Sequence, residues 1–189
     1  MDTQSYIEQL GEGAKRASRN ISLASFSQRN EFLKRLSEEL SNSKKIILKA
    51  NQKDLVEAAN NGLSESLLDR LRIDPSTIDK MIDSVREILN LPDPIGQIEN
   101  LRNMPSGIKV GQMSVPIGVI GIIYESRPNV TIEAASLCVK SGNTVILRGG
   151  SEAISSNQCL ADCLSTALDQ AKLPVRAVQL VETVDRAAV

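Results

Sequence analysis

The chain has 189 residues, and its 22 Lys and Arg side chains nearly balance 23 Asp and Glu, for a formal net charge of −1. This balance argues against a nucleic-acid-binding protein, and the 41% of hydrophobic residues excludes a chain that is disordered throughout. Because histidine is absent, the chain alone cannot form a Ser-His-Asp or Cys-His hydrolase or a metal site with His ligands.

The cysteines are few and odd in number, which argues against a secreted disulfide scaffold. They are Cys138, Cys159 and Cys163. Cys159 and Cys163 would share one helix face, where two thiols could bind a soft metal, but no further ligand is visible and we expect core packing for all three. With no apolar signal core and no stretch long enough for a bilayer, we expect a reduced, cytoplasmic protein without membrane contact or metal.

Residues 1–90 have a helical pattern. The most distinct helix is predicted after Asp74, a favourable N-cap, with Pro75 in the first helical position. Its apolar residues recur every three or four positions until prolines end the helix at 91–94. Further helices are predicted around 32–40, 44–60 and 64–71.

After Pro105 the pattern alternates between strands and helices. Apolar residues on both sides of Gly111 predict a strand pair or hairpin. Three apolar runs predict buried parallel strands, the first of them covered on both faces. These strands are expected at 117–124, 144–148 and 177–181, with helices at 129–140 and 152–171 between them and another helix beginning at Asp185.

The predicted fold class is therefore α/β. We expect an N-terminal helical region, residues 1–106, that packs on a partial doubly wound, Rossmann-like parallel sheet. Residues 107–189 would supply the first β-α-β-α-β part of that sheet.

Polar segments follow the first two predicted strands, where open α/β sheets bind ligands. Each segment carries an arginine, Arg127 or Arg148, which suits phosphate. Gly149-Gly150 would let a ligand approach the backbone, and Ser151 could cap a helix whose N-terminus favours anions. A plain strand-to-helix turn is the alternative. Because neither G-x-G-x-x-G nor G-x-x-x-x-G-K-[ST] is present, the pattern indicates only a nucleotide or phosphate ligand.

Two segments carry a specific family resemblance. Residues 115–131, VPIGVIGIIYESRPNVT, and 141–153, SGNTVILRGGSEA, resemble the γ-glutamyl phosphate reductases of the aldehyde dehydrogenase superfamily. Residues 50–55, 67–71 and 91–96 resemble the same family in the same order, so the resemblance covers nearly the whole chain.

The resemblance implies a step of proline biosynthesis, in which γ-glutamyl phosphate is reduced with NADPH to glutamate 5-semialdehyde and phosphate. In the family a cysteine thiolate attacks the acyl phosphate, and hydride transfer then reduces the thioester. That cysteine belongs to a second domain, so no catalytic residue is expected within this chain. We expect the chain alone to be inactive and full-length members to form homo-oligomers.

Site residues follow from the resemblance one by one. Arg148 would contact the adenosine ribose and pair with the 2′-phosphate of NADP, and Tyr124 would border the cofactor. The same cofactor segment contains Gly149, Gly150, Ser151 and Glu152. Ser126, Arg127 and Asn129 are the candidates for binding the acyl phosphate of the substrate.

Two other functions stay open from the sequence. The chain could be a catalytically inactive module that binds a nucleotide or a protein partner. It could also be a non-functional truncated product, which would expose an apolar sheet edge and aggregate.

Overall fold

A computed structural model describes residues 2–183 and 185 of the chain. The first half is helical, as predicted. Its helices are α1 (Thr3–Leu23), α2 (Phe26–Asn42), α3 (Lys44–Asn60), α4 (Glu65–Leu71) and α5 (Pro75–Asn90). None of the described helices combines the length and the hydropathy that a membrane span requires.

Local capping explains where two of these helices begin. Asp74 accepts a hydrogen bond from the Thr77 backbone N–H at 2.6 Å, and Pro75 opens α5, which confirms the predicted start. Ser25 and Gln28 form a reciprocal capping box at the start of α2. Each cap satisfies backbone donors that the first helical turn leaves free.

The second half forms the predicted parallel sheet, in the order β3-β4-β5. Its strands are β3 (Val119–Ile123), β4 (Thr144–Arg148) and β5 (Val178–Leu180), connected through α6 (Asn129–Lys140) and α7 (Ile154–Gln170). Short 3₁₀ turns, Ser151–Ala153 and Val175–Ala177, precede α7 and β5. The β-α-β-α-β order and the α/β class are confirmed.

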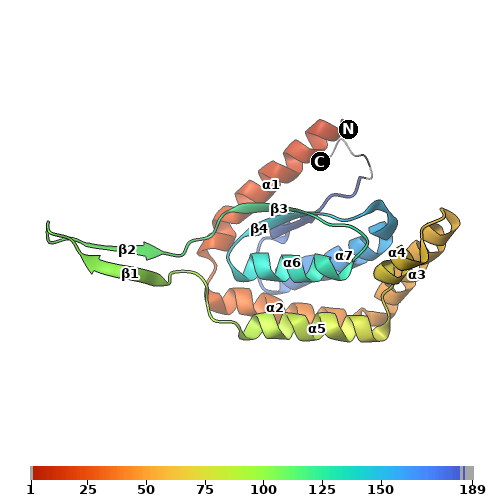
Figure 1. The fold of residues 1–189 in the computed structure, drawn as a ribbon, viewed down its shortest axis with the longest axis horizontal. Helices are drawn as coiled ribbons and strands as arrows, with labels where there is room; N and C mark the ends of the chain where they lie inside the picture. Colours follow the sequence, from red (N-terminus) through yellow and green to blue (C-terminus); the bar gives the residue numbers. More distant parts are fainter. Residues whose placement is uncertain (1, 184, 186–189) are drawn as a thin grey trace.

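Helices cover both faces of the sheet (Figure 1). α1 lies against β4 on one face, α6 and α7 lie on the other, and α2 and α5 form a further layer beyond them. The buried core is mostly aliphatic, with Phe32 as its one aromatic member among the described residues, and it runs without interruption from α1 and α2 to β4 and α7. The helical region therefore shares one core with the sheet, and the division at residue 106 stays a prediction.

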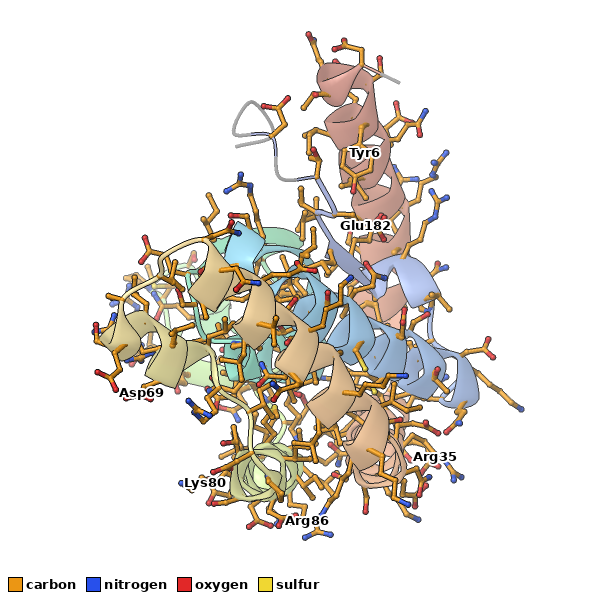
Figure 2. The ribbon with its side chains drawn as sticks, turned by 90° about the vertical axis from the view of Figure 1, so that its right-hand side faces the viewer. Tyr6, Arg35, Asp69, Lys80, Arg86 and Glu182 are labelled. Atoms are coloured by element: carbon orange, nitrogen blue, oxygen red, sulfur yellow. The ribbon has the colours of Figure 1, made fainter. Side chains whose placement is uncertain are left out.

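The chain that follows β5 returns alongside α1 (Figure 2). The Tyr6 hydroxyl accepts from the Glu182 backbone N–H at 3.0 Å, and Thr3 Oγ1 donates to an Asp185 carboxylate oxygen at 2.9 Å. On the opposite side, Arg35 and Arg86 project into solvent. The predicted helix beyond Asp185 lies outside the described residues.

A long antiparallel hairpin projects from this body (Figure 1). It consists of β1 (Ile98–Asn103) and β2 (Lys109–Met113), and every residue of both strands is exposed. The predicted turn at Gly111 is wrong, because Gly111 lies within β2. The actual turn contains Pro105 and Gly107, and the Met104 backbone N–H donates to the Ile108 carbonyl at 2.9 Å.

The first parallel strand is less covered than predicted. In β3 the side chains of Val119 and Ile123 are exposed, while Ile120 and Ile122 are half-buried. β3 is an edge strand, so its packing partners lie mainly on one side. The expectation of coverage on both faces is therefore wrong, since an apolar run does not reveal whether its strand is central or at an edge.

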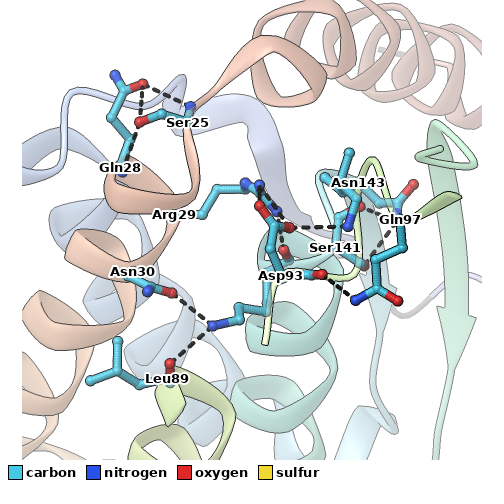
Figure 3. Close-up of polar contacts among 11 residues, drawn as sticks. Ser25, Gln28, Arg29, Asn30, Leu89, Asp93, Gln97, Ser141 and Asn143 are labelled. Atoms are coloured by element: carbon cyan, nitrogen blue, oxygen red, sulfur yellow. Dashed lines mark hydrogen bonds and ion pairs between the residues drawn. The ribbon is translucent and has the colours of Figure 1, made fainter. Parts of the chain in front are cut away.

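An ion pair between a buried arginine and a half-buried aspartate anchors the hairpin to the helices (Figure 3). Arg29, whose exposed fraction is 2%, donates through Nη2 to both Asp93 carboxylate oxygens at 3.1 and 2.8 Å. Its Nη1 donates to the Lys140 carbonyl at 2.5 Å. Lys140 Nζ in turn donates to Asn30 Oδ1 at 2.8 Å and to the Leu89 carbonyl at 2.9 Å. These bonds connect α2, the end of α6 and the segment that leads into β1.

The pKa of Asp93 reflects this anchor. Burial alone would raise the pKa of its carboxyl group, but the Ile95 backbone N–H and the Arg29 guanidinium together bring it below its ordinary value.

The other arm of the hairpin is held by Asn143, whose Oδ1 accepts from the Gly118 backbone N–H at 2.8 Å. Its amide nitrogen donates to the Ser141 carbonyl at 3.1 Å.

Candidate functional site

A cavity of about 310 Å³ lies at the carboxyl ends of the parallel strands. The turn after β4 forms one wall, and the residues after β3 and β5, the start of α7, and α4 with the residues just before it form the others. The lining residues are Leu63, Leu67, Glu125, Ser126, Arg148, Gly149, Gly150, Ser151, Glu152, Ile154, Asn157, Leu180, Val181 and Thr183. The structure therefore brings together five of the six residues assigned to the cofactor, with Ser126 from the substrate set.

The turn after β4 has room only for glycine at its first position. A Cβ atom added to Gly149 would lie 2.1 Å from Asn157 Nδ2, far inside van der Waals contact. The side-chain amide of Asn157, in α7, therefore packs directly on the backbone of the turn. This packing explains Gly149 without a ligand, and its role toward a ligand stays a prediction.

The N-terminus of α7 is already capped from a distant part of the chain. Ser151 makes no side-chain cap, so the expectation that it caps the helix is wrong. Instead Asp54 of α3, 1% exposed, accepts from the Ser155 and Ser156 backbone N–H groups at 3.0 and 2.7 Å. Asn51, one helical turn earlier, donates to Ser156 Oγ at 3.1 Å. These amides are thus satisfied by a carboxylate of the protein.

Arg148 borders the cavity, and most of its donors have no acceptor among residues 2–183 and 185. Its Nη2 donates to the Asp185 carbonyl at a long 3.3 Å, and within the described residues its buried Nε has no acceptor. Its backbone carbonyl accepts from the Tyr124 N–H at 3.0 Å and continues the ladder between β3 and β4. The strand pairing therefore fixes the backbone of Arg148, while the guanidinium can still bind an acceptor.

Ser126 and Glu152 connect the segments after β3 and β4. Ser126 Oγ donates to Glu152 Oε1 at 2.5 Å, and Ser126 is 5% exposed. Ser126 was expected to bind the substrate, but its hydroxyl proton is donated to Glu152 within the protein. The second Glu152 carboxylate oxygen can accept hydrogen bonds from hydroxyl groups.

A chain of hydrogen bonds runs beneath the cavity. Thr131 Oγ1 donates to Asn157 Oδ1 at 3.0 Å, and the Tyr124 hydroxyl lies 2.6 Å from Thr131 Oγ1. Burial raises the pKa of Tyr124, although its bond to Thr131 opposes that rise, so the phenol stays protonated. The sequence assigned Tyr124 to the cofactor, but the structure turns its hydroxyl toward α6.

The remaining substrate candidates lie apart from this cavity. Arg127 is exposed and borders a second hollow of about 400 Å³, which Glu125 and Ser126 also line. Asn129 begins α6 and donates to Glu133 Oε1 at 3.4 Å. Neither residue lines the cavity beside Arg148. Ser126 and Arg127 meet in the second hollow, whereas Asn129 lines neither, so the structure joins only two of the three substrate candidates.

A family model described as "Aldehyde dehydrogenase family" matches residues 1–189. The chain belongs to the aldehyde dehydrogenase family. Among solved structures, γ-glutamyl phosphate reductase from Thermotoga maritima is 37% identical with a TM-score of 0.92. The Saccharomyces cerevisiae γ-glutamyl phosphate reductase is 30% identical, with a TM-score of 0.90. These likenesses confirm the family resemblance and the aldehyde dehydrogenase type of fold.

The matches cover nearly all of this chain but less than half of the relatives. They span 96% of this chain in both cases, and 44% of the Thermotoga and 47% of the yeast reductase. Methylmalonate-semialdehyde dehydrogenase from Oceanimonas doudoroffii, 20% identical with a TM-score of 0.74, shares the fold over 35% of its own length.

Members of the aldehyde dehydrogenase family use nicotinamide cofactors, and the cavity suits part of such a dinucleotide. Arg148 offers donors for phosphate oxygens, Glu152 offers an acceptor for ribose hydroxyls, and Gly149 exposes backbone beside them. These side chains stand at the strand ends, where sheets of this kind bind nucleotides. The donor and acceptor set therefore fits the group.

The cysteines do not contribute to this site. Cys138 and Cys163 are buried and Cys159 is half-buried, and all three are free thiols. Burial raises the pKa of Cys138 and of Cys159 to about 11, so neither is a thiolate at neutral pH. The expected core role of Cys138 and Cys163 is confirmed.

Proposed function

We propose that the chain forms the N-terminal, cofactor-binding part of an NADPH-dependent γ-glutamyl phosphate reductase. In this reaction γ-glutamyl phosphate, NADPH and a proton give glutamate 5-semialdehyde, phosphate and NADP⁺, a step of proline biosynthesis in the cytoplasm. One observation carries the proposal: a donor-rich cavity at the strand ends belongs to a chain 37% identical to the Thermotoga maritima reductase.

The choice of NADPH over NADH rests on Arg148. The 2′-phosphate of NADPH carries negative charge at neutral pH, and a guanidinium offers several donors that stay charged. Arg148 ends β4 beside the cavity, and its only described hydrogen bond through the guanidinium is the long one to Asp185. This uncommitted charge supports a preference for the phosphorylated cofactor.

The nucleophile of the reaction is proposed to lie outside these residues. Cys138 and Cys159 have raised pKa values of about 11 and belong to the packed helices α6 and α7. A thiol that attacks an acyl phosphate must ionise near neutral pH and reach the substrate. The 189-residue chain should therefore bind cofactor without turning over substrate.

A chimera tests the proposal directly. These 189 residues would replace the matching N-terminal part of the Thermotoga maritima reductase, and NADPH formation would be followed with glutamate 5-semialdehyde, phosphate and NADP⁺. We expect turnover by the chimera and none by the 189-residue chain alone.

Two results would contradict the proposal. Turnover by the 189-residue chain would refute the external nucleophile. A folded chimera that binds NADPH without turnover would favour the inactive binding module instead. Since a chimera can fail to fold, NADPH and NADH are also titrated into the 189-residue chain, and equal affinity for both would refute the preference for NADPH.

A further inference from the structure

Asn157 brings an unused hydrogen-bond donor to the cavity. The residue lies in the first turns of α7, its exposed fraction is 2%, and it lines the cavity wall. Within the described residues, no group accepts a hydrogen bond from its Nδ2. Asn157 Nδ2 is not one of the enclosed side-chain atoms without a partner, so it is open to the cavity and can donate to a ligand there.

The hydrogen bonds beneath the cavity fix which way this amide faces. A threonine hydroxyl has one proton, and Thr131 gives that proton to Asn157 Oδ1. Tyr124 must then donate to Thr131 Oγ1, because a protonated phenol has its own proton to give. The donors therefore run in one order, from Tyr124 to Thr131 to Asn157. The carbonyl oxygen of Asn157 points to α6, and its NH₂ group points to the turn after β4.

The NH₂ group lies where a ligand would meet the backbone. A Cβ atom at Gly149 would come within 2.1 Å of Asn157 Nδ2, so only glycine leaves the donor in this place. The nearby charged groups that line the cavity are Arg148, Glu125 and Glu152. Two of these three are carboxylates, which repel ligand oxygens. The neutral amide of Asn157 adds a donor for such oxygens without adding charge to the cavity.

We propose that Asn157 is a ligand-binding residue of this cavity. Its Nδ2 donates to an acceptor oxygen of the dinucleotide, a phosphate or ribose oxygen, at the turn that Gly149 begins. Thr131 is the positioning residue that holds the amide in the donating orientation. The inference rests on the proposed function, because it takes NADPH as the occupant, and it adds a residue from α7 that neither the strand ends nor the family resemblance indicated.

Asn157→Asp is the direct test, because it keeps the size of the side chain and the acceptor for Thr131 but replaces the donor with a carboxylate oxygen. NADPH is titrated into the 189-residue chain and its own fluorescence is followed, since the chain has no tryptophan to interfere. We expect the dissociation constant to rise at least roughly tenfold, because a donor to the ligand becomes a repelling acceptor.

Thr131→Val tests the positioning role. It removes the hydroxyl that holds Asn157 and leaves the amide itself intact, so we expect a rise of about threefold in the dissociation constant. Asn143→Asp is the matched control. Asn143 is also buried, 3% exposed, but its bonds lie beside Gly118 and Ser141, at the opposite end of β4. It should lower the melting temperature and leave the dissociation constant unchanged.

The outcomes separate this inference from the proposed function. If the unchanged chain does not bind NADPH, both are overturned. If it binds and Asn157→Asp binds equally well, only the role of Asn157 is overturned. If Asn157→Asp does not fold, Thr131→Val decides, and an affinity equal to that of the unchanged chain refutes the inference. A rise for Asn143→Asp as large as for Asn157→Asp would also refute it.

Discussion

Both ends of the parallel sheet have an arginine and a carboxylate, but the two ends differ in how far these groups are hydrogen-bonded within the protein. At the amino end, Arg29 makes three hydrogen bonds, two of them to Asp93 and one to the Lys140 carbonyl. At the carboxyl end, within the part of the chain that the structure describes, the Arg148 guanidinium makes one long bond to the Asp185 carbonyl, and Glu152 accepts from Ser126 rather than from an arginine.

An unpartnered atom does not by itself distinguish the two ends. The Nε atoms of Arg29 and Arg148 are both buried without an acceptor in the part of the chain that the structure describes. The difference is that the terminal nitrogens of Arg29 are committed to other segments of the chain, whereas Arg148 borders a cavity. Committed charges hold elements together, and uncommitted charges beside a cavity are available to a ligand.

The largest effect should come from breaking the committed end. Arg29→Met removes the buried partner of this ion pair, so the Asp93 carboxylate keeps the Ile95 backbone N–H but loses both Arg29 bonds, and the Lys140 carbonyl loses its Arg29 donor. We expect a loss of about 3 kcal/mol in the free energy of unfolding, measured by urea denaturation. Arg35→Met is the matched control, because Arg35 pairs with Glu31 and Glu38 on the surface and should matter little. An equal loss of unfolding free energy for Arg29→Met and Arg35→Met would contradict the proposal that Arg29 holds the amino end of the sheet together.

A smaller effect, of a different kind, should follow at the uncommitted end. Arg148→Met should weaken NADPH binding by roughly tenfold, about 1.4 kcal/mol, because a charged donor for phosphate is lost. NADH binding and the free energy of unfolding should change little, since the guanidinium makes one long hydrogen bond to the residues that the structure describes. Calorimetric titration with each cofactor measures this. A loss of stability as large as that of Arg29→Met would contradict the comparison.

The smallest effect should appear as pH dependence. The pKa of Asp93 is lower in the folded chain than its ordinary value of 3.8, so the folded state favours the ionised carboxylate. Its contribution to stability is complete above that value and is lost as the pH falls through the lowered pKa. Asp93→Asn should be less stable than the unchanged chain at neutral pH, and the difference should shrink in acid. A difference in unfolding free energy between the two proteins that stays the same from neutral to acidic pH would refute this.

Much of the fold was predictable because its signals are local. Asp74 and Pro75 mark the start of α5 within a few residues of sequence, and the β-α-β-α-β order follows from apolar runs separated by helical spacing. The errors concern neighbours that the sequence does not reveal. The apolar run of β3 looks the same for a central strand and for an edge strand, and the hairpin was placed around Gly111 although its turn contains Pro105 and Gly107.

The site was predictable only as far as the strand ends. Arg148 ends β4 and Glu152 lies in the turn that follows it, so the topology alone places them at the strand ends, near Ser126. Asn157 and Thr131 carry no local signal, because they meet only when α6 packs beside α7. Asp54 is 101 residues from Ser155, and no periodicity indicates that it would replace Ser151 as the cap of α7.

This distant cap has a consequence for how the chain is made. A ribosome releases α3 long before α7, so the carboxylate of Asp54 must stay hydrated until the strand-turn-helix segment that it completes has emerged. The cavity wall that α7 contributes can therefore form only after the N-terminal helical region is present. Expressed without residues 1–106, the sheet would carry the sequence of the site but would lack the group that terminates α7, so the two regions should not be separable as working halves.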